Sequence, residues 1–181
     1  MLLLDACCLI NLVATDQLSE ILRALPHDCA TSRLVVSTEV ISVGRPGAAS
    51  AALEREVLAP SWLGSLESLK ILDFSNEGEL ASFIQFAARL DDGEASVCAL
   101  AVAQGGAVAT DDRKTLRLLE REHPQVAVVQ TPELLYEWAE LEGLRDQEMS
   151  RVLRSVYRRG RFYPRRDAPR FDWWERLCPK Q

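Results

Sequence analysis

Short apolar runs alternate along the chain with longer segments whose apolar residues recur at helical spacing. The apolar runs, which predict strands, lie at 1–4, 33–37, 68–74, 106–110 and 126–130. The helical segments lie at 6–25, 76–90, 91–105, 113–124 and 132–143. Strands separated by helices need crossover connections, which make the strands parallel and cover both faces of the sheet. The pattern predicts an α/β three-layer sandwich with a mostly parallel central sheet of about five strands.

The segment between the second and third predicted strands is expected to be helical. Residues 38–43 (TEVISV) predict a short helix, and residues 48–59 have a strongly helical composition. One more helix is predicted over 144–164, whereas residues 165–181 show no clear element. Trp173 and Trp174 in this last stretch are expected to be packing anchors.

Composition indicates a globular chain of the cytoplasm. The apolar fraction of 48% is ample for a core, and no run approaches the ~20 apolar residues of a membrane span. The apolar start, residues 1–14, lacks a basic region and is interrupted by Asp5, unlike a signal peptide. The five cysteines form no C-x-x-C pair, which favours reduced core thiols over disulfides or structural zinc.

Charge divides the chain into two parts. Residues 1–142 carry a balance of −12, and residues 143–181 carry +6. We therefore predict a catalytic or binding domain over 1–143 and a basic helical extension over 144–181. On a helix, Arg151, Arg154 and Arg158 share one face. This stripe is either a solvated face, an RNA contact or a docking site for an acidic partner.

Acidic residues follow the predicted strands or open the helix at 91–105. They are Asp5, Glu39, Asp91, Asp92, Glu94, Asp111 and Asp112. Glu39 is expected to open the helix after the second strand. Because ligands of open parallel α/β sheets bind beyond the carboxyl ends of the strands, these carboxylates are expected to converge at one edge.

Helix capping is the simpler explanation for each acid taken singly. An acid at a helix start stabilises it by ~0.3–1 kcal/mol. However, capping alone would place Ser, Thr, Asn or Gly at some of these positions, and Glu is a poor N-cap. Converged carboxylates repel by ~4 kcal/mol per pair at about 4 Å in an effective dielectric constant of ~20, which a divalent cation would offset. Ligands that are all oxygen favour Mg²⁺ or Mn²⁺ over zinc.

Four segments around these acids resemble, in order, the acidic motifs of the PIN-domain nucleases, the family that includes the VapC toxins. The segments are LLLDACCLINL, VVSTEVI, LDDGEASVCALA and VATDDRKTLRLLE. The third resembles the branch in which Gly-Glu-Ala replaces the more usual Asp-Ala, so that Glu94 takes the third acid's place. Cys7 stands where a hydroxyl residue is common. The resemblance covers roughly residues 1–163.

The resemblance implies a metal-dependent endoribonuclease, the toxin of a toxin–antitoxin pair, that cleaves RNA by a metal-activated water. It implies catalytic roles for Asp5, Glu39, Glu94 and Asp112. Mg²⁺ or Mn²⁺ would be held by Asp5, Glu94 and Asp112, with Asp92 and Asp111 as further candidates. Asp111 and Asp112 compete for the fourth position, and the Thr110-x-Asp112 spacing favours Asp112. The implied partners are RNA, an antitoxin and a second copy in a homodimer, with no membrane.

Two other classes stay open. A receiver-type signalling domain also binds Mg²⁺ with clustered acids, and Asp73 roughly matches its phospho-accepting residue. However, the fifth strand ends in VVQT without the Lys that such a domain needs. The other alternative is a non-catalytic PIN-like module that binds RNA or protein.

Overall fold

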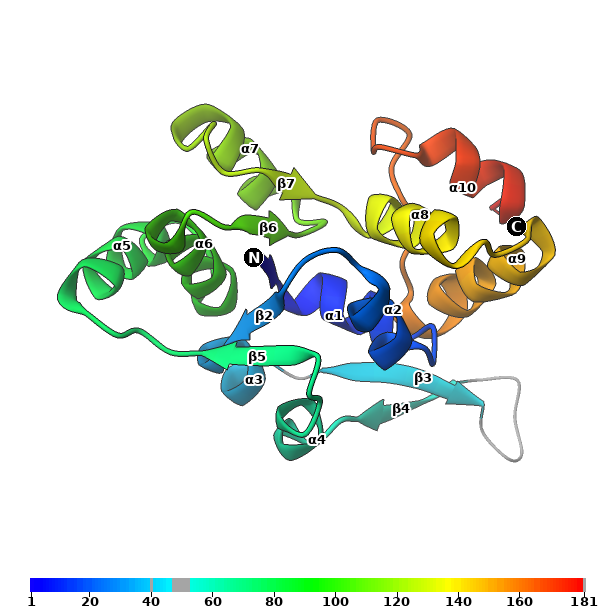
Figure 1. Cartoon of the computed structure of the whole chain (residues 1–181), viewed down its shortest axis with the longest axis horizontal. Coiled ribbons are helices and arrows are strands. Elements are labelled where there is room, and N and C mark those ends of the chain that lie inside the picture. Colours follow the sequence, from blue (N-terminus) through cyan, green and yellow to red (C-terminus); the bar gives the residue numbers. More distant parts are fainter. Residues whose placement is uncertain (40, 47–52, 181) are drawn as a thin grey trace.

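The computed structural model describes residues 1–39, 41–46 and 53–180 of the chain. Its central sheet is parallel throughout, with strand order β5–β2–β1–β6–β7. The strands are β1 (Leu2–Leu4), β2 (Cys29–Ser32), β5 (Leu69–Leu72), β6 (Ala107–Ala109) and β7 (Val128–Val129). Helices α5 and α6 lie on one side of this sheet, and α1, α2 and α8 on the other (Figure 1). The predicted three-layer α/β sandwich is confirmed.

The helices largely follow the predicted pattern. They are α1 (Ala6–Val13), α2 (Leu18–Ala24), α3 (Arg33–Thr38), α4 (Pro60–Gly64), α5 (Glu77–Ala87), α6 (Asp92–Gln104), α7 (Arg113–Glu122), α8 (Thr131–Glu142), α9 (Asp146–Ser155) and α10 (Phe171–Leu177). A π-helical segment, η1 (Val156–Gly160), continues α9. The segment predicted as one helix over 6–25 is two helices, separated at a turn where Asp16 has a φ of 63°. Within the described residues, no helix is long and apolar enough to span a membrane.

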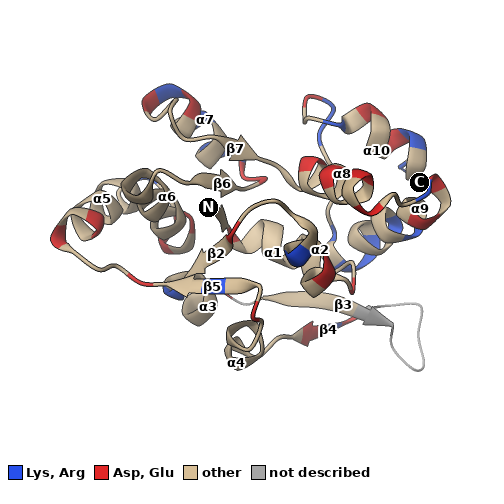
Figure 2. Cartoon of the chain, viewed as in Figure 1, with Lys and Arg blue, Asp and Glu red and all other residues tan. Residues whose placement is uncertain are grey.

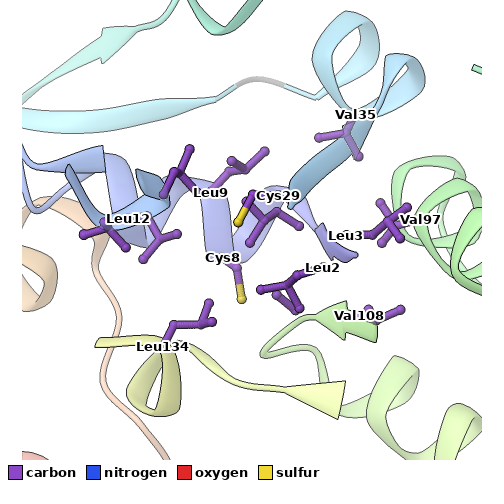
Figure 3. Close-up of a cluster of buried hydrophobic side chains, with 14 of the residues drawn as sticks. Leu2, Leu3, Cys8, Leu9, Leu12, Cys29, Val35, Val97, Val108 and Leu134 are labelled. Carbon is purple, nitrogen blue, oxygen red and sulfur yellow. The ribbon is translucent and has the colours of Figure 1, made fainter. Parts of the chain in front are cut away.

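The core is centred on β1. Leu2, Leu3 and Leu4 are each at most 1% exposed, as expected for a central parallel strand covered on both faces. Helix α6 packs directly on β1, β2 and β6, and its Val97 is fully buried. Figure 3 shows Val97 beside Leu3, with Val108 of β6 nearby. Burial of β1 fixes where its last residue, and hence Asp5, must lie.

The second strand was placed wrongly by the sequence pattern. The run at 33–37 is the helix α3, and the strand β2 precedes it. Ser32 caps this helix, because its Oγ accepts a hydrogen bond of 3.0 Å from the amide of Val35. Packing of α3 on α6 outweighs the strand preference of the β-branched residues. Glu39 consequently ends a helix as its C-cap, and does not open one.

The helices predicted over 38–43 and 48–59 are also wrong where the structure describes them. Strand β3 (Ser42–Pro46) pairs antiparallel with β4 (Leu53–Val57). Residue 40 of the first prediction and residues 48–52 of the second lie outside the described residues. The Arg55 guanidinium spans the pair by donating to the Ser42 carbonyl at 3.0 Å. Cross-strand pairing and burial of Val43 override the helical composition of the segment.

The C-terminal residues pack against the rest of the chain. Ser155 Oγ donates to the carbonyl of Ala14 at 2.7 Å, and Arg159 Nε donates to the carbonyl of Gly44 at 2.8 Å. Helix α10, which lies where the sequence pattern shows no clear element, buries Trp174 completely. The division of the chain at residue 143 stays a prediction.

Trp174→Ala is expected to cost about 3–5 kcal/mol of unfolding free energy, because a fully buried aromatic side chain is lost. Trp173→Ala is the matched control, since the neighbouring ring is only partly buried, and a clearly smaller loss is expected. Urea unfolding of both variants measures the difference. Equal losses would show that α10 adds little to the stability of the fold.

Candidate metal centre

The pairing of β1 with β6 brings two of the predicted acids to one place. Leu4 lies opposite Ala109, and the amide of Asp5 donates to the carbonyl of Ala109 at 3.0 Å. The chain runs outward from β1 through β2 to β5, and then returns to the other side of β1 with β6. Ligands of open α/β sheets bind beyond the carboxyl ends of the strands at such a reversal, and we call this place the β1–β6 crevice. Asp5 and Asp112 follow these two strands.

Asp5 is almost fully buried and held by three hydrogen bonds. Its Oδ1 accepts from the amide of Ala6 at 2.7 Å, which caps α1. Its Oδ2 accepts from the Cys7 thiol at 3.1 Å and from the Thr110 hydroxyl at 3.0 Å. Burial raises the pKa of Asp5, these hydrogen bonds oppose the rise, and the charge of Asp112 adds to it. Cys7 therefore serves, as a thiol, in the position where a hydroxyl is common.

Thr110 links Asp5 to Asp112. Its fully buried hydroxyl donates to Asp5 and accepts from the amide of Asp112 at 3.1 Å. Asp112 in turn caps α7, because its Oδ1 accepts from the amides of Lys114 and Thr115 at 2.8 Å each. Two carboxylates from different strands are thus held in a fixed relation through one hydroxyl.

Glu39 and Glu94 complete the acidic cluster, which we define as Asp5, Glu39, Asp91, Asp92, Glu94 and Asp112. Partial burial, followed by the charges of Asp112 and Asp5, raises the pKa of Glu94 to about 7. Burial, followed by the charges of Asp5, Asp91 and Asp92, raises the pKa of Glu39. The two glutamates come from the end of α3 and the first turn of α6. The charges of Asp5 and Asp91 act on both glutamates, so acids from separate segments of the chain lie within electrostatic reach of one another.

Gly93 makes room for Glu39. A Cβ at this position would lie 2.7 Å from Glu39 Oε1 and 3.2 Å from Glu39 Cγ. The first turn of α6 is fixed to the sheet, since Ser96 Oγ lies 2.6 Å from Ser32 Oγ and donates to the carbonyl of Gly93 at 2.7 Å. The absence of a side chain at this position of the DDGEA segment thus leaves the space that Glu39 occupies.

The donor set of the acidic cluster fits a hard divalent cation. All its side-chain donors are carboxylate oxygens, and no Lys or Arg pairs with any of them in the described part of the chain. The cluster is nevertheless open: across the described residues, Cys7, Cys8 and Asp111 form the one trio of potential metal ligands within 4.8 Å of one another. Caps fix Asp5 and Asp112, so the longer Glu39 and Glu94 are the members free to adjust.

Asp111 belongs to a separate network. Its Oδ1 accepts from the amide of Thr131 at 3.0 Å, and its Oδ2 accepts from Asn11 Nδ2 at 3.0 Å and from the Thr131 hydroxyl at 2.5 Å. The Cys8 thiol also donates to Oδ2, at 3.5 Å. Burial raises the pKa of Cys8 well above its usual value. The network ties α1 to α8, and Asp111 does not join the acidic cluster.

The remaining predicted residues lie elsewhere. Arg151, Arg154 and Arg158 are exposed on α9 and η1 and contact no carboxylate of the acidic cluster among the described residues. Asp73 follows β5, the edge strand, and pairs with Arg33 at 2.9 Å. Sequence reasoning missed Thr110 as a link between the acids. Its only signal was the Thr-x-Asp spacing.

Comparison of the chain with protein-family models, with curated proteins and with solved structures finds no match. Its function has therefore to be inferred from the arrangement of side chains and from the resemblance of the four motifs. The arrangement consists of the acidic cluster at the β1–β6 crevice and the separate Asp111 network behind it.

Glu94→Gln is expected to stabilise the metal-free protein at high pH. The folded-state pKa of about 7 lies above the ordinary value of 4.5. Between these two pH values the folded state therefore binds more protons than the unfolded state, and it loses stability as the pH rises. Discounted for partial exposure, the variant should gain about 1 kcal/mol at pH 8, or ~2–4 °C in Tm, and nothing at pH 4. Thermal unfolding in EDTA measures this.

Glu77→Gln is the control for this experiment, because Glu77 also stands in the first turn of a helix but is exposed. Its Tm difference from the wild type should not change between pH 4 and pH 8. A Glu94→Gln difference that is equally flat would contradict the electrostatic strain assigned to Glu94.

Gly93→Ala is expected to displace Glu39 while sparing the fold. The methyl group meets the mobile end of a side chain, and alanine favours a helix by ~1 kcal/mol over glycine. The Tm without metal should be unchanged or higher, but the rise in Tm on adding Mn²⁺ should shrink. Gly78→Ala is the control, since its Cβ meets only Asn76 at 3.2 Å. An undiminished Mn²⁺ effect in Gly93→Ala would place Glu39 outside the metal shell.

Proposed function

We propose that the protein is a metal-dependent endoribonuclease. The observation that carries this proposal is the convergence of Asp5, Glu39, Glu94 and Asp112 at the β1–β6 crevice without a cationic partner among the described residues. Such a cluster is costly by itself, and a bound divalent cation removes the cost. The four-motif resemblance to PIN-domain nucleases supports the same reaction.

The residues of the site have different proposed roles in metal binding. Asp5 and Asp112 are the fixed ligands, oriented by helix caps and by the Thr110 hydroxyl. Glu94 is the adjustable ligand, and Glu39 completes the shell directly or through water. When bound, Mg²⁺ or Mn²⁺ supplies a polarised phosphate and a bound water of lowered pKa. The pKa of Glu94, raised to about 7 by burial and by neighbouring carboxylates, marks the uncompensated negative charge that a bound cation would offset.

Metal-free chemistries have less support. His123 ends α7 and stacks on Phe86 at 5.0 Å between ring centroids, so it is remote from an acid–base role in the cluster. The Cys7 thiol donates to Asp5, and Cys8 is fully buried in the Asp111 network. A receiver-type function is disfavoured because Asp73 stands at the sheet edge in an ion pair with Arg33.

The biological role follows from the resemblance alone. We propose a toxin of a toxin–antitoxin pair, with an antitoxin and a second copy of the chain as partners. The exposed stripe of Arg151, Arg154 and Arg158 is then available for an acidic antitoxin segment. A PIN-like module that binds RNA without cutting it is the alternative, and an activity assay separates the two.

The purified protein is expected to cleave total cellular RNA with Mn²⁺ or Mg²⁺ and to lose this activity in EDTA. Glu94→Gln should lower the rate at least ~100-fold, since even outer-shell changes at metal sites cost 10–100-fold. Asp112→Asn should do the same while keeping the helix cap, because Asn caps as well as Asp. Gel electrophoresis of the products and the Tm of each variant provide the readouts.

Glu77→Gln serves again as the matched control and should cleave like the wild type. If the wild type binds RNA without cleaving it, the non-catalytic module becomes the better assignment. Cleavage that survives Glu94→Gln would mean that another acid of the DDGEA segment fills the third position.

A further inference from the structure

A cleft of about 410 Å³ on α7 gathers positive charge beside the acidic cluster. The charged residues that line it are Arg89, Asp112, Arg113, Lys114, Arg117 and Arg121. These five cations are half of the ten Lys and Arg in residues 1–142, a part of the chain that is otherwise strongly acidic. Figure 2 shows the charged side of α7 and the separate basic positions on α9. The sequence pattern did not predict this concentration.

Three of these cations are available for a ligand. Arg113, Lys114 and Arg117 are exposed, and none has a carboxylate partner in the part of the chain that the structure describes. Arg89 and Arg121 instead both pair with Glu122, at 2.5 Å each. Because Arg113, Arg117 and Arg121 are four residues apart, they form a row along α7 with steps of about 6 Å.

The cleft is continuous with the candidate metal centre. Asp112 lines the cleft, caps α7 and raises the pKa of Glu94, so it belongs to both sites. The row of cations begins at the next residue, Arg113. One end of an anion bound along this row would therefore lie next to the carboxylates at the β1–β6 crevice.

A larger cavity of about 650 Å³ lies on the other side of α7 and shares Arg113 and Arg117 with the cleft. Leu116, Val126 and Val128 give it apolar walls, and Arg165 closes it from the C-terminal segment. Its size is within the range of ligand pockets, and its mixed lining suits a base turned out of a single strand. A peptide with acidic side chains would not need such a cavity.

We propose that the cleft binds the phosphate backbone of single-stranded RNA next to the scissile phosphate, so that α7, and not α9, is the main RNA contact. This inference rests on the proposed function and specifies its substrate subsite. Guanidinium groups bind phosphate oxygens through paired hydrogen bonds, and each neutralised phosphate releases counterions.

The test compares two variants that remove the same charge. One carries Arg113→Gln, Lys114→Gln and Arg117→Gln, and the other carries Arg151→Gln, Arg154→Gln and Arg158→Gln. The probe is a fluorescein-labelled, 12-nucleotide single-stranded RNA of mixed sequence, titrated in EDTA at several salt concentrations. The α7 variant should bind about tenfold or more weakly, and its salt slope should be shallower by ~2, at ~0.7 per lost contact. The α9 variant should bind within about twofold of the wild type.

Unchanged binding by the α7 variant, or equal weakening of both variants, would overturn the proposal. So would a poly-glutamate peptide that binds the wild type more tightly than the RNA in an α7-dependent way, because it would identify an acidic protein as the ligand. Should the triple variant fail to fold, Arg117→Gln alone is expected to reduce the slope by ~0.7, and an unchanged slope would count against the cleft.

Cleavage assays with Mn²⁺ distinguish failure of this inference from failure of the proposed function. A wild type that does not cut RNA but binds it through α7 upholds the cleft and refutes the nuclease. A wild type that cuts RNA, with an α7 variant of unchanged KM, upholds the nuclease and refutes the cleft. For a nuclease that uses the cleft, KM should rise in the α7 variant more than kcat falls.

Discussion

The parallel pairing of β1 with β6 is the contact on which the site depends. It sets Leu4 opposite Ala109, so that the next residues, Asp5 and Thr110, share a hydrogen bond. Slippage by one residue would turn every side chain of β1 to the opposite face. Because all three leucines of β1 are buried, such slippage would disrupt both faces of the core. The stability of the sandwich and the position of the first acid are therefore secured by the same packing.

This arrangement places carboxylates close enough to repel one another. Burial and like charge both raise the pKa of Glu94 and of Glu39, which means that the folded chain holds these groups under unfavourable conditions. Burial also raises the pKa of Asp111, only one residue from Asp112, but hydrogen bonds from Thr131, Cys8 and Asn11 oppose that rise. Two adjacent aspartates thus have different physical roles: one fastens α8 to α1, and the other faces the acidic cluster.

Much of the sandwich could be predicted, because the local spacing of apolar residues identifies its helices and most of its central strands. The region around α3 and β4 was not, since β-branched residues in α3 and helix-forming residues near β4 take the conformations that their neighbours impose. Glu39 was assigned to the site through an incorrect strand, yet the end of α3 brings it to the same crevice. The net charge of the sequence does not reveal the cations of α7, because the surrounding acids mask them.

The contact between Glu39 and Gly93 links two positions that are 54 residues apart in the chain. A side chain at position 93 and a glutamate at position 39 compete for one volume. Substitutions at these two positions are therefore not independent, and a larger residue at one calls for a shorter residue at the other. A chain that kept the sandwich while exchanging this pair would retain the helices α3 and α6 but would present a different set of carboxylate oxygens at the crevice. The fold thus leaves the composition of the acidic cluster free to vary at this one point of contact.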